Sequence, residues 1–470
     1  PTEVKQWDDL GSSEYKEALL AHFLTHRDER YSHLSDHRFA KLCALVKNHS
    51  EVFVIDGVTP STVSGYEFDI ELEPGAKPVR QQLPKLAPQA MIKERYHVLK
   101  EEQLGHLRVP DDEAKSDWAT RTHVVAKKDD PNGRWICDFR PLNRVTVKRC
   151  TAIGGVFSKT RALASKRWKS GLDAWSGFNQ LKATERASRL LQIITSFGMR
   201  QWTVLPFGVT NGPSYFQEFM LTLYGGSKHG PDMLGESMSD LDAIMEVWID
   251  DVQLGSGSLT DGPARERDDL DSSAEPDGFD QHLEALGRVL KRASLANLRF
   301  KLDKCYFAQF ALETLGMVAG NGIVKADPRK IQGIASWPRP TRVEDVEKFL
   351  ATTVFIREHL SPQYSQISKP LRDVLTTLQE SRRQGYKSRA RFMKPPPVDG
   401  NTESGETAWP PFWSDACEKS FNTLKRLVTH SVDLQVPDFK GAADGSNLLH
   451  IWPDACAYGI GGGLFQGYPP

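Results

Sequence analysis

The chain has 470 residues, of which 39% are hydrophobic and 26% charged, and its formal net charge is −1. This length predicts roughly two to four structural units, and the composition excludes a membrane protein and a wholly disordered chain. The sequence has no run of apolar residues long enough to span a bilayer. Its first residues have neither the basic stretch nor the apolar core of a secretory signal, so we expect an intracellular protein.

Six cysteines are spread along the chain: Cys43, Cys137, Cys150, Cys305, Cys417 and Cys456. Because they form no CxxC pair and no Cys/His cluster, they argue against a disulfide framework and against a structural zinc, and we expect them to be reduced. The sequence begins with Pro1 and not with Met, so we expect it to be a segment of a longer precursor.

The first predicted elements are helical stretches at residues 14–24 and 39–46. They lie among polar residues without recognisable chemistry, so we expect residues 1–65 to be a linker segment. A helix is predicted over residues 88–107. A basic β-hairpin with a turn rich in Asp, Pro and Gly is then predicted over residues 122–139.

Further helices are predicted at residues 281–296 and 346–354, because apolar side chains recur there at helical spacing. Residues 379–407 are polar and contain three consecutive prolines, which indicates a linker. Another helix is expected around residues 421–428. A strand is expected to begin in the segment 448–466, which ends in a run of small residues.

Charge is strongly segregated along the chain. Residues 115–169 contain fourteen Lys and Arg against four Asp and Glu, whereas residues 232–280 contain fifteen acidic residues against two Arg. Such segments are either ordinary solvated surface or a phosphate-binding region beside an acidic metal-binding centre. The motifs must decide between these two interpretations.

Among the five Asp-Asp pairs of the sequence, Asp250-Asp251 differs from the others by its apolar flanks. The segment IMEVWI (residues 244–249) precedes it, and Val252 and Leu254 follow it. This pattern predicts two apolar strands that meet at an acidic turn. Two adjacent carboxylates beside a hydrophobic core repel each other and lose hydration, so a divalent cation is their expected partner.

Asp173 shows a related pattern, because it ends a predicted strand and precedes a turn at Ser176-Gly177. With Asp250 and Asp251 it would supply three carboxylates for two Mg²⁺ ions roughly 3.5 to 4 Å apart, or for Mn²⁺ in their place. Such a metal pair activates an attacking 3′-hydroxyl and stabilises a leaving pyrophosphate. The structural alternative makes Asp173 a helix N-cap and the Asp-Asp pair a plain hairpin turn.

Several motifs follow one another in a fixed order. They are RWICDFRPLN (134–143), WKSGLDAWSGFNQL (168–181), LPFGVTNGPSYFQ (205–217), WIDD (248–251), and Leu315-Gly316 followed by residues 323–340. In this order they resemble the reverse transcriptase of gypsy-type LTR retrotransposons, and the similarity extends from about Tyr66 to Gln466.

The resemblance implies an α+β fold. It is that of a right-hand polymerase with fingers, palm and thumb, followed by a connection region and a truncated RNase H-like α/β unit. The implied divisions are the linker segment 1–65, fingers and palm 66–321, thumb 322–377, linker and connection 378–445, and the start of the RNase H-like unit 446–470.

The same resemblance implies roles for charged residues. Asp173, Asp250 and Asp251 become the catalytic and metal-binding carboxylates of an RNA-directed DNA polymerase. Lys127 and Arg134 fall on the hairpin that contacts the nucleotide triphosphate, where a Lys point charge and a forked guanidinium suit phosphate oxygens.

Roles for aromatic and turn residues also follow from the resemblance. Phe178 would pack under the incoming sugar and leave no room for a 2′-hydroxyl, which implies DNA synthesis from dNTPs. Phe207 would line the nucleotide pocket. Trp248, Leu315 and Gly316 would contact or support the primer end. Position 248 is nearly always Tyr in the family, so the Trp leaves open a slower or inactive enzyme.

Two alternatives remain open. Residues 225–243 and 256–279 are longer than the usual connections, and together with Trp248 they are compatible with a catalytically inactive scaffold derived from a retroelement that still binds nucleic acid. An RNA-synthesising palm polymerase would use the same carboxylates, but an aromatic gate at Phe178 argues against it.

The end of the sequence resembles the opening strands of RNase H, with Asp454 as its first carboxylate. RNase H chemistry needs further acidic ligands, so we expect no RNA cleavage by this chain. The implied partners are an RNA or DNA template and its primer. No membrane is expected as a partner. Protease and integrase parts of a Pol polyprotein would lie outside the chain. Binding is expected to be mostly sequence-neutral and to weaken as salt rises.

Overall fold

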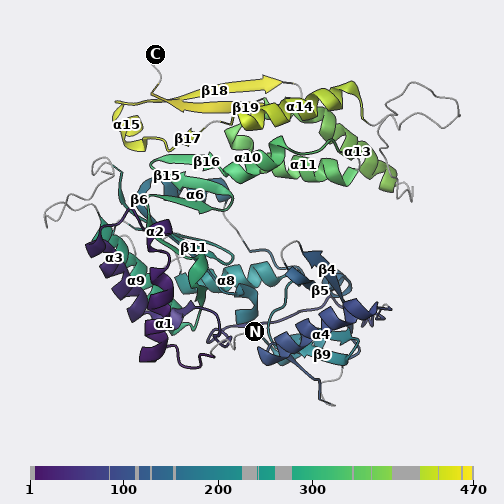
Figure 1. Cartoon of the computed structure of the whole chain (residues 1–470). Coiled ribbons are helices and arrows are strands. Elements are labelled where there is room, and N and C mark those ends of the chain that lie inside the picture. The colour runs from purple at the N-terminus through teal and green to yellow at the C-terminus, as the bar shows by residue number, and fades with distance from the viewer. Residues whose placement is uncertain are drawn as a thin grey trace. The chain divides into compact units, whose positions relative to one another are not determined.

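The computed structural model divides into two compact units. The first comprises residues 1–159 and 166–312, and the second comprises residues 160–165 and 313–470. Figure 1 labels their elements. The described residues are 6–83, 85–111, 116–127, 130–151, 155–224, 241, 243–259, 278–340, 343–360, 363–383, 413–431, 433–456 and 459–467.

A four-stranded antiparallel sheet forms the centre of the first unit, in the order β10-β11-β6-β13. Its strands are β6 (Lys166–Asp173), β10 (Ile244–Trp248), β11 (Asp251–Ser258) and β13 (Tyr306–Gln309). Helices α8 (Gly212–Tyr224) and α9 (Phe279–Leu295) pack against this sheet. The helix expected at residues 281–296 is therefore α9, and its buried Leu286 and Leu290 keep the helical spacing of the sequence pattern.

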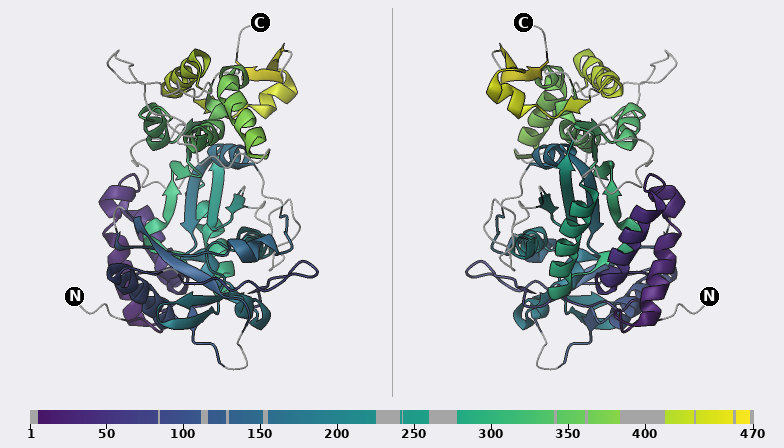
Figure 2. Two further views of the ribbon diagram at one scale, coloured as in Figure 1. Left: turned by 90° about the vertical axis from the view of Figure 1, so that its right-hand side faces the viewer. Right: turned by 90° about the vertical axis from the view of Figure 1, so that its left-hand side faces the viewer.

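The N-terminal segment differs from the linker expected at residues 1–65. It contains α1 (Ser13–Leu24), α2 (Arg27–Arg30) and α3 (Asp36–Asn48). Figures 1 and 2 show α1 and α3 beside α9, and α3 contacts both of these helices. Burial explains the difference, because Tyr15 and Phe23 are almost fully buried and the Phe23 ring lies 5.9 Å from that of Phe307. Each buried aromatic side chain contributes roughly 1.5–3 kcal/mol.

A five-stranded sheet in the order β3-β9-β8-β4-β5 forms another part of the first unit. Its strands are β3 (Leu107–Arg108), β4 (Thr120–Lys127), β5 (Asp130–Cys137), β8 (Gln192–Thr195) and β9 (Gly198–Trp202). Helix α4 (Pro88–Gln103) packs on β3, β4 and β5. Strands β4 and β5 form the basic hairpin that the sequence predicts.

The described part of the first unit also contains shorter elements. They are η1 (Ser50–Val52), α5 (Arg140–Arg144), η2 (Gly177–Gln180), α7 (Glu185–Leu190), η4 (Leu302–Lys304), the parallel pair β1 (Phe53–Val54) and β12 (Phe300–Lys301), and the parallel pair β2 (Glu67–Phe68) and β7 (Lys182–Ala183). Helix α6 (Val156–Ala164) contributes residues to both units.

The second unit combines a small sheet with a helical core. The sheet has the order β14 (Ala311–Thr314), β15 (Met317–Gly320), β16 (Ile323–Ala326) and β17 (Leu434–Gln435). The other elements are α10 (Pro328–Ala335), α11 (Val343–Phe355), η5 (Arg357–His359), α12 (Tyr364–Ile367), α13 (Lys369–Arg383), α14 (Asp415–Thr429), α15 (Phe439–Asp444), β18 (Leu449–Cys456) and β19 (Gly459–Gln466).

The core of the second unit lies between its helices, where the rings of Phe349 on α11 and Phe421 on α14 are 4.6 Å apart. Residues 379–383 of the expected polar linker belong to α13, and the rest of that linker lies outside the described residues. None of the described helices combines the length and the apolar character needed to cross a membrane. Five cysteines are free: Cys43, Cys137, Cys150, Cys305 and Cys417. Cys456 ends β18, and its side chain is outside the described part.

Candidate active site

The central sheet brings the three predicted carboxylates together. Strand β6 ends at Asp173 and strand β11 begins at Asp251, and these two residues face each other in the antiparallel register. The backbone N–H of Ala174 donates to the carbonyl oxygen of Asp250 at 3.0 Å, which fixes the turn beside the end of β6. Residues more than seventy positions apart in the sequence therefore meet where β6 ends and β11 begins, at one end of the two central strands.

The turn that carries Asp250 is tight and strained. Only Ile249 and Asp250 separate β10 from β11, and Ile249 has φ = 55°. Such a conformation is unfavourable for a β-branched residue and costs roughly 1–3 kcal/mol. The backbone N–H of Ile249 donates to the side-chain oxygen of Gln217 on α8 at 2.7 Å. This bond helps to hold the turn against the strain.

The site carries more negative than positive charge. Burial, followed by the charges of Asp250 and Asp173, raises the pKa of Asp251 to about 7. Burial also raises the pKa of Asp250, and the charge of Asp173 adds to this effect. Lys304 acts in the opposite direction, and its Nζ lies 2.9 Å from Oδ1 of Asp173. One exposed lysine does not balance three carboxylates, so the geometry favours a bound divalent cation.

Aromatic side chains lie beside the carboxylates. Phe178 belongs to η2, five residues after Asp173, and its ring is 5.2 Å from that of Phe207 and 5.8 Å from that of Phe216. Phe207 is 63% exposed. A Cβ on Gly177 would lie 3.0 Å from the Phe216 ring and 3.3 Å from Cβ of Asp250, so the close approach of η2 to the acidic turn favours glycine there.

The predicted basic residues lie on the β4-β5 hairpin of the other sheet. Arg134 is exposed and pairs with Val125 across the hairpin. Gly133 has φ = 73°, and a Cβ there would lie 2.4 Å from the carbonyl oxygen of Val125, so only glycine fits. Lys127 ends β4, while its side chain is outside the part that the structure describes.

The comparison with protein families decides what this arrangement is. Residues 125–328 match the family model described as "Reverse transcriptase (RNA-dependent DNA polymerase)", and this range contains the three carboxylates and the aromatic cluster. Residues 125–328 form a reverse transcriptase domain. The resemblance read from the motifs is thereby confirmed.

Curated relatives extend the similarity beyond this reverse transcriptase domain. The chain is 28% identical over 347 residues to the "Retrovirus-related Pol polyprotein from transposon opus" of Drosophila melanogaster, covering 73% of this chain and 29% of the relative. It is 26% identical over 359 residues to that of transposon gypsy from the same organism, covering 75% and 29%. The chain thus spans less than a third of the length of these relatives.

Solved structures agree with the predicted α+β right-hand polymerase fold. The foamy viral protease-reverse transcriptase in complex with dsDNA aligns with a TM-score of 0.64 at 15% identity, covering 99% of this chain and 80% of that one. The same protein in complex with an RNA/DNA hybrid aligns with a TM-score of 0.59 at 15% identity, covering 93% and 48%. These likenesses establish the fold.

Trp248 occupies the last position of β10 in the reverse transcriptase domain, directly before the strained turn. It is opposite Asp251 in the register and is half-buried. Trp248, which stands where the family usually has Tyr, therefore lies next to the carboxylates. Most of the two long connections on either side of this hairpin, at residues 225–243 and 256–279, lies outside the described residues.

The remaining predicted residues belong to the second unit. Leu315 and Gly316 form the turn between β14 and β15, with φ values of 49° and 72°. The positive φ of Gly316 is rarely adopted by residues with a side chain, which favours glycine at this position. Asp454 lies in β18 and pairs with Gly461, and its side chain is outside the described part.

Asp138 directly follows strand β5 of the basic hairpin and is hydrogen-bonded to several neighbouring side chains. This buried carboxylate accepts hydrogen bonds from Arg140 at 2.6 and 2.9 Å, from Gln81 at 3.2 Å and from Arg121 at 3.2 Å. The bonds from Arg140 contribute most to holding the pKa of Asp138 well below its usual range, against the opposing effect of burial. The carboxylate is therefore ionised throughout the neutral range.

This depressed pKa predicts a pH-dependent contribution to stability. The contribution is fully present above the unfolded-state pKa of about 4 and is lost as the pH falls towards the folded-state value. We expect Asp138→Asn to lower the free energy of unfolding by about 1–3 kcal/mol at pH 7 and by less at pH 3. Urea unfolding from pH 7 to pH 3 measures this, with the exposed Asp117→Asn as the matched control. A pH-independent difference would contradict the expectation.

Two contributors to the site were not singled out from the sequence. Gln217 lies within the LPFGVTNGPSYFQ motif, but no local signal connects its side chain to a turn thirty-two residues away. Lys304 follows Asp303 in a short 3₁₀ helix, and only the pairing of β13 with β6 brings it to Asp173. Both were missed because their partners are distant in sequence.

Proposed function

We propose that this chain is an RNA-directed DNA polymerase that adds dNTPs to the 3′ end of a primer. The observation that carries the proposal is the pairing of Asp173 with Asp251, beside Asp250, in a site with an excess of negative charge. The match of residues 125–328 to the reverse transcriptase family supports it. The Pol polyproteins among the relatives support the proposal as well.

Asp173, Asp250 and Asp251 are the residues that would hold two Mg²⁺ ions, or Mn²⁺ in their place. The reverse transcriptase family generally uses divalent metal ions. The residues fit such ions, because their carboxylate oxygens are hard ligands and the raised pKa values of Asp250 and Asp251 reflect uncompensated negative charge. When bound, the ions supply activation of the primer 3′-hydroxyl and stabilisation of the leaving pyrophosphate.

Other residues of the domain would bind the nucleotide. Arg134 is exposed on its hairpin and suited to the triphosphate, and Lys127 is proposed to act beside it. Phe178 would lie under the sugar and exclude a 2′-hydroxyl, and its contacts with Phe207 and Phe216 limit how far its ring can move aside. Phe207 offers the exposed aromatic surface expected of a nucleotide-pocket wall.

The template and primer would bind mainly through phosphates and duplex shape. The foamy viral enzyme with the same fold is described in complexes with dsDNA and with an RNA/DNA hybrid, and we propose the same ligand classes here. Trp248 would contact the primer terminus, and Leu315 and Gly316 would support it. Because phosphate contacts release counterions, binding should weaken as salt rises.

The divisions read from the sequence remain proposals: fingers and palm at residues 66–321, thumb at 322–377, connection at 378–445, and an RNase H remnant with Asp454 at 446–470. The observed division into compact units falls at residues 312–313, slightly earlier than the proposed end of the palm. Protease and integrase parts, where they accompany this chain, would belong to the same Pol polyprotein.

Primer extension tests the proposal directly. We expect the purified chain to extend an oligo(dT) primer on poly(rA) with dTTP, in a reaction that depends on Mg²⁺ or Mn²⁺. Binding of the same template-primer is measured in parallel. Binding without any extension in either metal would favour the inactive scaffold, and a preference for ribonucleotides would favour an RNA-synthesising enzyme.

Trp248→Tyr is run beside the unmodified chain. Tyr would restore the family's usual residue at a half-buried position next to the acidic turn, so we expect a gain of roughly 3- to 10-fold in extension rate, at most about 1.4 kcal/mol of transition-state stabilisation. The outcome identifies whether this position limits turnover. An equal or lower rate would show that Trp248 is not the limiting departure.

A further inference from the structure

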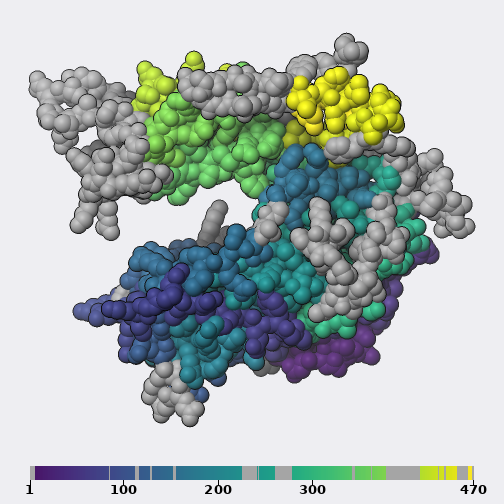
Figure 3. All heavy atoms as spheres, turned by 180° about the vertical axis from the view of Figure 1, so that it is seen from behind, coloured from purple at the N-terminus to yellow at the C-terminus, as the bar shows by residue number. Residues whose placement is uncertain are grey.

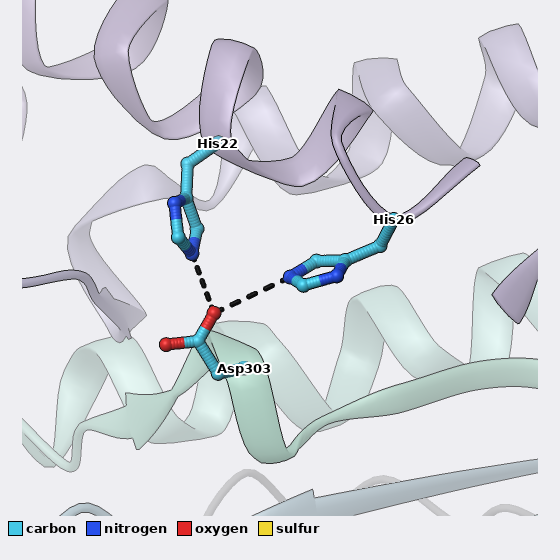
Figure 4. Close-up of side chains that lie close together, drawn as sticks. All are labelled: His22, His26 and Asp303. Atoms are coloured by element: carbon cyan, nitrogen blue, oxygen red, sulfur yellow. Dashed lines mark hydrogen bonds and ion pairs between the residues drawn. The ribbon is translucent and has the colours of Figure 1, made fainter. Parts of the chain in front are cut away.

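The N-terminal segment and the central part of the first unit converge on a cluster of three potential metal ligands. Nε2 of His22 lies 2.5 Å and Nε2 of His26 lies 3.3 Å from the same carboxylate oxygen of Asp303. Figure 4 shows both imidazole rings directed at this oxygen, with the second carboxylate oxygen turned away. All three ligand atoms lie within 4.8 Å of one another.

Local structure explains why the two histidines face the same side. His22 lies in the last turn of α1, and His26 follows four residues later, directly before α2. Helix α1 ends between them, and the backbone N–H of His26 donates to the carbonyl oxygen of Phe23 at 3.1 Å in the turn that follows. This turn places the two imidazole rings 5.5 Å apart. The buried Tyr15, Leu19 and Phe23 fix α1 against the core.

Asp303 approaches the histidines from an element that lies 281 residues after His22 and 277 residues after His26. It belongs to η4, which follows β12, the strand that pairs with β1. Arg30 donates to the backbone carbonyl oxygen of Asp303 at 2.7 Å, which adds a fixed connection between the segments. The ligands are therefore held by packed elements on both sides. Figure 3 shows the purple N-terminal segment at the surface, where it borders later parts of the chain.

The ligand types favour zinc over magnesium. Imidazole nitrogens bind Zn²⁺ and similar transition metals well, whereas Mg²⁺ prefers oxygen ligands with near-octahedral geometry. Two histidines and one carboxylate leave a fourth position for water. The side chains are between 16% and 38% exposed, so an ion can enter from solvent.

Two positive charges lie beside the cluster and oppose a cation: Arg30, which is bonded to the backbone carbonyl oxygen of Asp303, and Lys301. Nζ of Lys301 lies 3.6 Å from the second oxygen of Asp303. The same ammonium lies closer to Asp56, at 2.8 Å, so its charge is shared with another carboxylate. Lys301 therefore weakens cation binding without occupying the oxygen that the histidines share.

We propose that His22, His26 and Asp303 form a binding site for Zn²⁺ or a similar transition metal ion. The ion would connect the end of α1 to η4 and so stabilise the packing of the N-terminal segment on the first unit. These ligands are separate from the three carboxylates of the reverse transcriptase domain, and the proposal does not rest on polymerase activity. The proposed site contains no cysteine. The sequence argument against structural zinc was based on cysteine patterns and therefore did not detect it.

Metal titration tests this proposal with the full chain after removal of metals by a chelator. Co²⁺ is used as the probe, because bound Co²⁺ absorbs visible light and is displaced by Zn²⁺. The Asp250→Asn/Asp251→Asn variant serves as the background, so that the other acidic site does not contribute. We expect one equivalent of Co²⁺ to bind, Zn²⁺ to displace it, and Zn²⁺ but not Mg²⁺ to raise the Tm by about 2–4 °C.

Variants then locate the ion. In the same background, His22→Gln/His26→Gln should abolish the Co²⁺ absorption and the Tm rise, whereas His33→Gln/His37→Gln, which changes two other histidines of the same segment, should keep both. Asp303→Asn gives an independent loss of binding should the double His variant fold poorly. Absence of Co²⁺ binding in the background chain, or binding that survives in the folded His22→Gln/His26→Gln or Asp303→Asn variant, overturns the proposal.

Discussion

The Asp250→Asn variant is expected to lose primer extension by about 10³-fold, while it still binds template and primer. Asp250 lies on the tight turn beside Asp173 and Asp251, and an amide in its place removes one negative charge from the proposed metal site. Single-turnover extension of a poly(rA)-oligo(dT) substrate in Mg²⁺ measures the loss. Template-primer affinity is measured on the same preparation.

The stability of this variant separates a catalytic loss from misfolding. Burial and the charges of Asp250 and Asp173 together raise the pKa of Asp251, so the acidic residues destabilise one another without metal. Asp250→Asn should therefore have an equal or higher Tm in chelator. Asp8→Asn alters another Asp-Asp pair, exposed and remote in sequence, and should keep full activity. Extension by Asp250→Asn at more than a few per cent of the unmodified rate would remove Asp250 from the proposed role.

The Phe178→Val variant is expected to lower discrimination between dNTPs and ribonucleotides by roughly 10- to 100-fold. Phe178 contacts Phe207 and Phe216, so neighbouring aromatic side chains restrict the movement of its ring. Valine removes the ring and opens space for a 2′-hydroxyl. The ratio of kcat/KM for dTTP and UTP on the same primer measures the effect.

A matched control separates a gate from a general effect of lost packing. Phe197→Val makes the same change at a partly buried position beside Arg95, away from the carboxylates, and should leave discrimination unchanged. Phe178→Val should retain most of its dTTP incorporation, because Phe216 remains in the core. Normal dTTP incorporation with unaltered discrimination would exclude Phe178 as the gate.

The sequence predicted the main elements around the site because their signals are local. Apolar residues on both sides of Asp250-Asp251 indicated the strands that meet there, and the turn after Asp173 indicated the end of β6. The turn residues of the basic hairpin indicated β4 and β5. Helical spacing located α9. The ordered motifs identified the reverse transcriptase, because motif identity and order need no knowledge of contacts.

Other features depend on contacts between distant segments. The N-terminal residues looked like a linker because their helical stretches lie among polar residues without recognisable chemistry. Only the packing of α3 on α9 and of Phe23 on Phe307 shows that they belong to the core. The bond from Ile249 to Gln217 and the ion pair of Lys304 with Asp173 also require the folded chain.

By itself, therefore, the sequence indicated the family, the three candidate carboxylates and the departure at Trp248, since each is encoded in adjacent residues or in motif order. Only the tertiary structure decided how much charge the acidic site leaves uncompensated, because burial and the neighbouring carboxylates raise the pKa values of Asp250 and Asp251 against the smaller effect of Lys304. It alone also brought His22 and His26 to Asp303. A ligand cluster drawn from segments so far apart exists only once strand pairing and helix packing have placed them together.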